Sequence, residues 1–313
     1  MKTSSKRSCS PQSPDPSSGA DDERAVAGGV PAAVGLVDAH THVFPPEMIL
    51  HREAYLERDA RFGSLYRSPK AAMVSADDLV GRMDENGVDL CVMVGFPFAD
   101  LGLCRLVNDH IVEAVGRFPG RLAGLACVAI EAPGAAAELD RCLDAGLRGC
   151  GELAPDPHEM HPGKQRGRGG LASIACSLRE RGLPLLVHAS EPFGHQYPGK
   201  GRFTPEACFA LAQAHPGLTV IFAHLGGGLF LYEAMPEVRR TLADVFYDTA
   251  AVPYLYDPGV YEACLATAGS QKLIFGSDYP LLAPGRYREG LSRLDPDARA
   301  AMQSGNARRV FKI

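Results

Sequence analysis

The sequence Val34-Gly-Leu-Val-Asp-Ala-His-Thr-His42 is an apolar, strand-like run that ends in two histidines separated by one residue. Residues i and i+2 of a β-strand project from the same face, about 6.5 to 7 Å apart, so the imidazoles of His40 and His42 can converge on one cation. Imidazole is a common ligand of zinc and similar ions. The run therefore predicts a strand with a metal site at its carboxyl end.

Three further apolar runs each end in a polar residue that the apolar context does not explain. They are residues 183–187 before His188, residues 218–223 before His224, and residues 272–277 before Asp278. In a barrel of parallel strands the carboxyl ends meet at one mouth. We therefore expect these side chains to lie close to His40 and His42.

Eight apolar runs rich in β-branched residues recur along the chain, and segments of helical pattern follow them. Buried parallel strands that alternate with helices favour a (β/α)₈ barrel. An open doubly wound sheet is the alternative, but no Gly-x-Gly-x-x-Gly turn follows the first strand. Ser75 and Asp295 have the pattern of helix N-caps. The expected strands are residues 34–40, 88–95, 122–130, 147–153, 183–188, 218–224, 245–249 and 272–278.

Length and composition predict one large domain behind a polar head. The chain has 313 residues, and residues 1–33 are rich in Ser, Pro, Asp, Gly and Ala. This head lacks the long apolar stretch of a signal peptide, so we expect it to be disordered. Residues 34–313 have the size typical of a barrel of this kind.

The overall charge of the chain gives no reason to expect a polyanionic partner, and it is compatible with any small ligand. The chain carries 32 basic and 37 acidic side chains, a formal net charge of −5, so we expect neither nucleic acid nor a membrane as a partner. No window resembles a transmembrane helix. Nine cysteines without a Cys-x-x-Cys pair predict free thiols and a cytoplasmic location.

Two connections are much longer than ordinary βα turns, namely residues 41–74 and residues 189–202. Loops at this end of a barrel build the active site, so both are candidates for substrate contacts. The second connection carries four candidate substrate-binding residues, with a solvated polar loop as the alternative. A carboxylated or otherwise anionic substrate group would suit their chemistry. The four residues are His195, Tyr197, Lys200 and Arg202.

An ordered set of motifs resembles the amidohydrolase superfamily, in particular the branch of metal-dependent hydrolases and nonoxidative decarboxylases. The resemblance covers roughly residues 34–313 and implies a (β/α)₈ barrel. It also implies one divalent metal, usually zinc, and a catalytic or substrate-polarising role for His224. The implied ligands are His40, His42, His188 and Asp278. The motifs are Val37-Asp-Ala-His-Thr-His42, His188, Ala223-His-Leu-Gly-Gly-Gly228, Tyr247-Asp-Thr249, Phe275-Gly-Ser-Asp-Tyr-Pro280 and Gly305-Asn-Ala-Arg-Arg-Val-Phe311.

For several residues the sequence allows two interpretations. Asp278 is expected to bind metal and move a proton, and the alternative is a strand-end cap. Glu152 follows the fourth strand, where some relatives place a carboxylate that bridges two metals, so it either contacts a second ion or orients a ligand or the substrate. Asp248 either bonds a ligand histidine or caps its turn. His158 and His161, in the loop after the fourth strand, are weaker candidates for substrate contact.

Three functions are compatible with these residues. The first is a hydrolase that uses a metal-activated water on a C–N or C–O bond, as in an amide, lactone or ester. The second is a nonoxidative decarboxylase with the same metal site, although relatives that act on hydroxybenzoates often carry Glu-x-His where this chain has His-x-His. The third is a non-catalytic binding protein, which would predict the loss of a ligand, and none is missing. A small molecule is the expected partner, and a homodimer is compatible by analogy.

Overall fold

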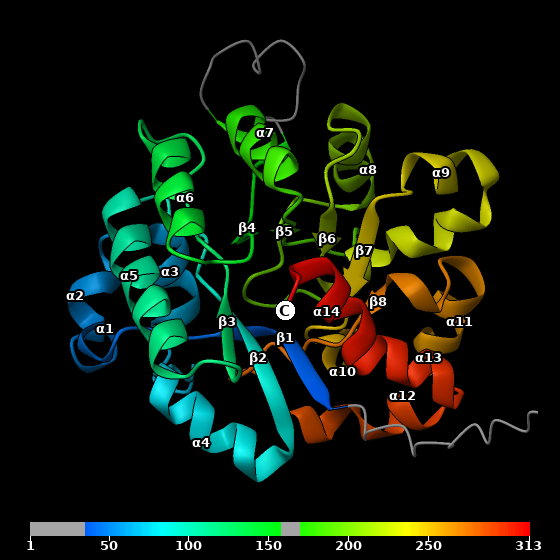
Figure 1. Ribbon diagram of the computed structural model, residues 1–313, viewed down its shortest axis with the longest axis horizontal. Coiled ribbons are helices and arrows are strands. Elements are labelled where there is room, and N and C mark those ends of the chain that lie inside the picture. The colour runs from blue at the N-terminus through cyan, green and yellow to red at the C-terminus, as the bar shows by residue number, and fades with distance from the viewer. Residues whose placement is uncertain (1–34, 158–169) are drawn as a thin grey trace, which may run out of the picture. The chain divides into compact units, whose positions relative to one another are not determined.

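The computed structural model describes residues 35–157 and 170–313, and eight parallel strands form the centre of this part (Figure 1). Each strand pairs with the next along the chain, in the runs β1-β2-β3 and β4-β5-β6-β7-β8. All eight expected strands are present, but most are shorter than expected. They are β1 (Leu36–His42), β2 (Val88–Val94), β3 (Leu122–Gly124), β4 (Cys150–Leu153), β5 (Leu185–Val187), β6 (Val220–Phe222), β7 (Val245–Asp248) and β8 (Leu273–Ile274).

Backbone hydrogen bonds join the two runs into a closed barrel. Between β3 and β4, the amide of Ala126 donates to the carbonyl of Gly149 at 3.0 Å. Between β8 and β1, the amide of Ala39 donates to Phe275 at 2.9 Å and the amide of Asp278 to His40 at 3.0 Å. The closure confirms the predicted barrel and excludes the open sheet.

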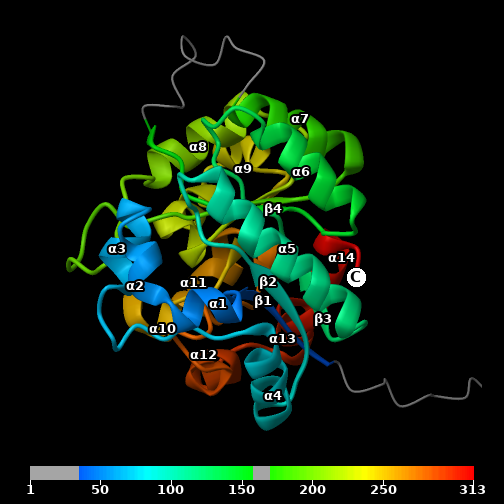
Figure 2. The same cartoon turned by 90° about the vertical axis from the view of Figure 1, so that its left-hand side faces the viewer.

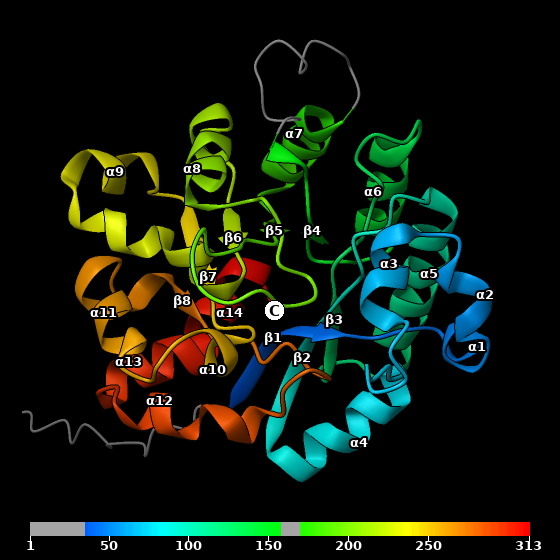
Figure 3. The same cartoon turned by 180° about the vertical axis from the view of Figure 1, so that it is seen from behind.

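Helices surround the barrel, and their ends match the signals in the sequence (Figure 3). Ser75 and Asp78 form a reciprocal capping box at the start of α4, and the Asp295 carboxylate accepts the amide of Ala298 at 2.8 Å at the start of α13. The helices are α1 (Pro46–Leu50), α2 (Arg52–Leu56), α3 (Ala60–Tyr66), α4 (Ala76–Asn86), α5 (Leu101–Arg117), α6 (Ala135–Asp144), α7 (Leu171–Arg181), α8 (Pro205–Ala214), α9 (Pro236–Thr241), α10 (Val252–Leu255), α11 (Val260–Thr267), α12 (Arg288–Ser292), α13 (Pro296–Ala300) and α14 (Asn306–Phe311).

The barrel interior is packed with side chains at one end and opens at the other. Along β2, Leu90 and Val92 face the interior, whereas Cys91 and Met93 pack outward against the helices. Phe311 of α14 completes the interior cluster. Figure 2 shows α14 and α3 at opposite ends of the barrel, so α3 lies at the mouth formed by the carboxyl ends of the strands.

The two long connections differ in structure. The first contains the three short helices α1–α3, and the second, after β5, runs from Ala189 to Phe203 without a helix. The eight cysteines in the described part are free thiols, as predicted. No helix of the described residues is long and apolar enough to cross a bilayer. The predicted head at residues 1–33 and the candidates His158 and His161 lie outside the described residues.

Candidate metal centre

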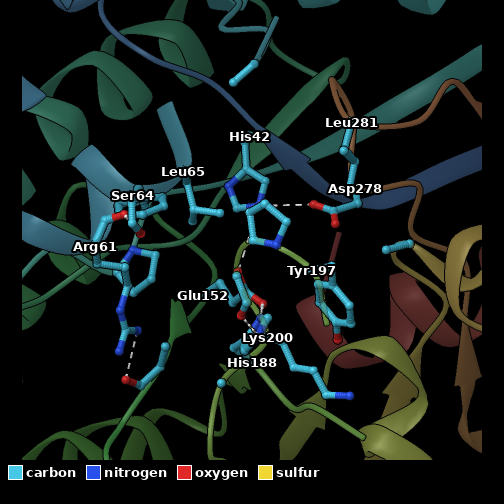
Figure 4. Close-up of a pocket in the computed structure, with 18 of the residues that line it drawn as sticks. His42, Arg61, Ser64, Leu65, Glu152, His188, Tyr197, Lys200, Asp278 and Leu281 are labelled. Atoms are coloured by element: carbon cyan, nitrogen blue, oxygen red, sulfur yellow. Dashed lines mark hydrogen bonds and ion pairs between the residues drawn. The ribbon is translucent and has the colours of Figure 1, made fainter. Parts of the chain in front are cut away.

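The two histidines of β1 meet at the mouth of the barrel. Pairing of β1 with β2 shifts register between Asp38 and Thr41, an irregularity of the kind that redirects strand side chains. His40 is fully buried and His42 nearly so. Their Nε2 atoms lie 3.3 Å apart, and Figure 4 shows His42 directed toward the pocket together with Asp278 and Glu152. The structure therefore brings this pair together as the sequence predicts.

Asp248 at the end of β7 fixes both His40 and His224. Nδ1 of His40 donates to one Asp248 oxygen at 2.8 Å. The other oxygen accepts the backbone amides of His224 and Ala250, both at 3.0 Å. Of the two interpretations of Asp248, the bond to a candidate ligand histidine is thus present, and the carboxylate also caps the following turn.

Asp278 reaches the same point from the end of β8. Its carboxylate lies 3.3 Å from Nε2 of His42 and 3.9 Å from Nε2 of His40. Its backbone φ is +63°, a left-handed conformation that non-glycine residues rarely adopt and that is concentrated at functional sites. The preceding Ser277 donates its amide and hydroxyl to Asp38 of β1 at 2.8 and 2.5 Å. These bonds fasten β8 to β1 directly beside the site.

Glu152, His188 and His224 form a second group of potential ligands beside the first. One Glu152 oxygen lies 2.9 Å from Nδ1 of His188 and 3.6 Å from Nε2 of His224. The other oxygen lies 3.9 Å from Nε2 of His40 and 3.8 Å from Nε2 of His42. Glu152 therefore connects the two groups, a contact that the sequence left open.

His188 also contacts the loop that follows β5. Its Nε2 lies 3.1 Å from the carbonyl oxygen of Gly199 and 3.3 Å from the hydroxyl of Ser190. Nδ1 lies on the other side of the ring, 2.9 Å from a Glu152 oxygen and 3.1 Å from Nε2 of His224. Nδ1 is therefore the nitrogen that faces the donor group.

The surroundings raise the pKa of two buried histidines of the site and lower the pKa of Asp278. Burial disfavours a charged His40, but the carboxylate of Asp248 and, to a smaller extent, those of Glu152 and Asp278 together outweigh burial and raise the pKa of His40 to about 10. For His224, burial is outweighed by the hydrogen bond with Glu152 and by nearby carboxylates, which raise its pKa to about 9. Burial opposes ionisation of Asp278, but its hydrogen bond with His42 and the adjacent imidazoles lower its pKa to about 2.

These donors fit a divalent ion. The group contains imidazole nitrogens and two buried carboxylates, the ligand types preferred by first-row divalent metals. Neither the lysine nor the arginine side chains of the described part approach these carboxylates as ion-pair partners within 4.0 Å. A divalent cation at this position would supply the positive charge that the two carboxylates require.

A pocket of about 960 Å³ opens above the donors. All four residues predicted from the loop after β5 line this pocket, with side chains partly or fully exposed. The Lys200 ammonium, however, donates to the carbonyls of Phe193 and His195 in its own loop, at 2.7 and 3.1 Å. Arg61 also lines the pocket, from α3, and was not predicted, because nothing in the sequence indicates that this helix lies over the mouth.

Solved structures with the same fold include enzymes of two reaction types. The chain is similar to 5-carboxyvanillate decarboxylase from Sphingomonas paucimobilis (TM-score 0.71, 18% identity, 90% of this chain and 100% of that chain). It is similar to the manganese complex of 5-carboxyvanillate decarboxylase from Novosphingobium aromaticivorans (0.70, 16%, 89% and 96%). It is also similar to a putative 2-pyrone-4,6-dicarboxylic acid hydrolase from Pseudomonas putida (0.62, 17%, 90% and 98%).

At these identities the likeness concerns the fold, and the family is shown by the sequence itself. The family model described as amidohydrolase matches residues 37–313, which include every described candidate ligand from His40 to Asp278. The match confirms the resemblance stated from the motifs. With its closed barrel and its strand-end histidines and aspartate, the chain belongs to the amidohydrolase family.

Proposed function

We propose that the protein is a metal-dependent nonoxidative decarboxylase of a small carboxylic acid. The observation that carries the proposal is the position of His224 beside the donor group at the base of a large pocket. Four side chains would hold the ion, with Glu152 beside them. When bound, the ion would stabilise negative charge that develops on the substrate. The proposed ligands are His40, His42, His188 and Asp278.

His224 is placed to supply the proton that decarboxylation consumes. The C–C bond to the substrate carboxylate breaks, its electron pair stays on the remaining carbon, and that carbon takes a proton as CO₂ leaves. Nearby carboxylates outweigh burial and raise the pKa of His224 to about 9 in the metal-free protein, which favours the imidazolium that would donate this proton and afterwards regain one from water. The bond of its Nδ1 with the carbonyl of Ala250 (2.8 Å) directs Nε2 toward the site.

The walls of the pocket support an anionic substrate with an apolar body. Apolar side chains, including Leu65, Phe96 and Leu281, line the pocket. Basic side chains lie among them, including Arg61 and Arg202. An apolar pocket with a few convergent cations suits an aromatic or unsaturated acid. The similarity of fold to decarboxylases of aromatic acids adds support.

Hydrolysis of a C–N or C–O bond is the second candidate, and two observations favour it. The first strand carries two histidines, and one similar structure is a putative hydrolase of a dicarboxylic acid. In this reaction Asp278, ionised because its pKa is about 2, accepts a proton from the attacking water and returns it to the leaving nitrogen or oxygen. His224 donates a hydrogen bond to the carbonyl oxygen.

Product analysis tests the two candidates. The protein, loaded separately with zinc and manganese, is incubated with panels of aromatic and unsaturated acids, lactones, esters and amides. We expect CO₂ release and, in D₂O, one deuterium at the carbon that lost the carboxylate. His224→Asn should abolish this release while metal content is retained. Hydrolysis products without CO₂ would replace the proposal with the second candidate. Zinc stays our prediction for the native ion. Manganese is tested beside it because imidazole and carboxylate donors accept manganese as well.

A further inference from the structure

We infer that the substrate carries a second, non-reacting carboxylate, which Arg61 binds at the rim of the pocket. This inference rests on the proposed function and narrows its substrate class to dicarboxylic acids. The reacting carboxylate would lie at the donor group, and the second would be retained in the product. Arg61 would then be the residue that selects dicarboxylates over monocarboxylates.

The position of Arg61 relates it directly to the donor group. Its guanidinium donates to the carbonyl oxygen of Ala154, in the segment that follows β4, at 3.0 Å. Ala154 lies two residues beyond Glu152, so this anchor is roughly 7 Å farther along the chain than Glu152. Figure 4 shows Arg61 on the α3 side of the pocket, with Leu65 from the same helix beside it. A small ring with substituents on both sides spans this distance.

The charge partners of Arg61 distinguish it from the two neighbouring arginines, Arg58 and Arg67. Arg58 pairs with Asp100 at 2.8 Å, and Arg67, the residue that follows α3, pairs with Glu57 at 2.9 Å. Among the described residues, Arg61 has no carboxylate partner within 4.0 Å, and its one bond goes to a backbone carbonyl. A guanidinium has five donors, so donors of Arg61 are left for a ligand.

Other basic groups of the pocket contribute charge but are less suited to hold the second carboxylate. The ammonium of Lys200 is bound to two carbonyls of its own loop. Lys70 and Arg202 also line the pocket and, like Arg61, have no described carboxylate partner within 4.0 Å. They add to a positive field at the rim. Arg61 differs because a hydrogen bond already fixes its planar group, which favours bidentate binding of a carboxylate.

Binding of two unreactive acids tests the inference without relying on turnover. Benzoate and isophthalate differ by one carboxylate, and neither has a ring hydroxyl. We would titrate each into the metal-loaded protein and into two variants by calorimetry. Isophthalate should bind about fivefold more tightly than benzoate, the effect of one well-oriented ion pair at an exposed arginine. Arg61→Gln should remove this preference and leave benzoate affinity within about twofold. Arg67→Gln, at the residue that follows the same helix and outside the pocket, should change neither affinity.

Three outcomes would overturn the inference: equal affinity of the unmodified protein for both acids, a preference that survives Arg61→Gln, or no binding of isophthalate at millimolar concentration. Unchanged benzoate binding in Arg61→Gln shows that the variant is folded. A failure of the proposed function can be distinguished from a failure of this inference. A dicarboxylate preference that depends on Arg61, together with no CO₂ from any acid in the panel, would keep the anion site and reject decarboxylation.

Discussion

The carboxylate of Asp248 accepts a 2.8 Å hydrogen bond from Nδ1 of His40, and both side chains are buried. The bond fixes the tautomer and the orientation of His40, so that Nε2 faces the donor group. Partners of this kind affect metal affinity strongly. We expect Asp248→Ala to weaken metal binding by about 10- to 100-fold, as measured by competition with a chelator of known affinity.

Asp244→Ala is the matched control, because Asp244 precedes β7 and is exposed at the other end of the same strand. It should leave metal affinity unchanged. Equal weakening in both variants would mean that Asp248 acts through general stability and does not specifically position His40.

Metal binding should become tighter as the pH rises. The pKa of His40 is raised to about 10 in the metal-free protein, so this imidazole carries two protons at pH 7. It must release the proton on Nε2 to bind an ion, while Nδ1 keeps its bond with Asp248. Affinity should therefore fall by up to about tenfold for each unit below pH 10 and each proton displaced.

Titrations at pH 6, 7 and 8, each in two buffers of different ionisation enthalpy, measure the number of protons released. We expect at least one proton per ion at pH 7. Affinity that is independent of pH, with no proton release, would show that His40 is neutral before the metal binds.

The strands of the barrel were predictable because each is a short apolar run, buried on both faces, that needs no partner to be recognised. Their lengths were overestimated. The predicted strand at residues 122–130 forms a ladder only from Leu122 to Gly124, after which a single bridge at Ala126 closes the barrel. Helices α1–α3 were not predicted, because elements of five to seven residues show no clear periodicity.

The donor group was predictable to the extent that strand ends must meet at one mouth. His40, His188 and Asp278 follow directly from that rule. Arg61 does not, because its place depends on how α3 packs. Phe62, its neighbour, is buried with ring centroids 5.8 Å from Phe44 and 5.5 Å from Phe96, and these contacts turn the helix over the mouth. Such packing leaves no mark in a single sequence.

The protein should bind one ion per chain. Asp278 and Glu152 are the two carboxylates within the donor groups, and together they balance the charge of one divalent ion. A second ion would need a further anion, since buried charges require partners. Metal analysis of dialysed protein should give a ratio near one, and Glu152→Gln should keep that ratio while weakening binding. A ratio near two that falls to one in Glu152→Gln would identify Glu152 as a bridging ligand.

Gly227 permits the loop after β6 to contact the chain that follows His188. Its φ is +60°, and a Cβ at this position would overlap the carbonyl group of Ser190. Gly228 also has a positive φ, +100°, but no atom lies within 4 Å of the position of its Cβ. Gly228→Ala should therefore lose only the conformational term, about 1–2 kcal/mol. Gly227→Ala should lose about 2–4 kcal/mol because overpacking adds to that term.

Urea unfolding of the two metal-free variants measures this difference directly. Folded Gly227→Ala should also bind metal more weakly than Gly228→Ala. Displacement of Ser190 would shift His188, which lies two residues before Ser190 in the chain. Similar losses of stability and affinity in the two variants would show that the loop relaxes without moving Ser190. The β6 loop would then not control the position of His188, and its glycines would serve backbone conformation alone.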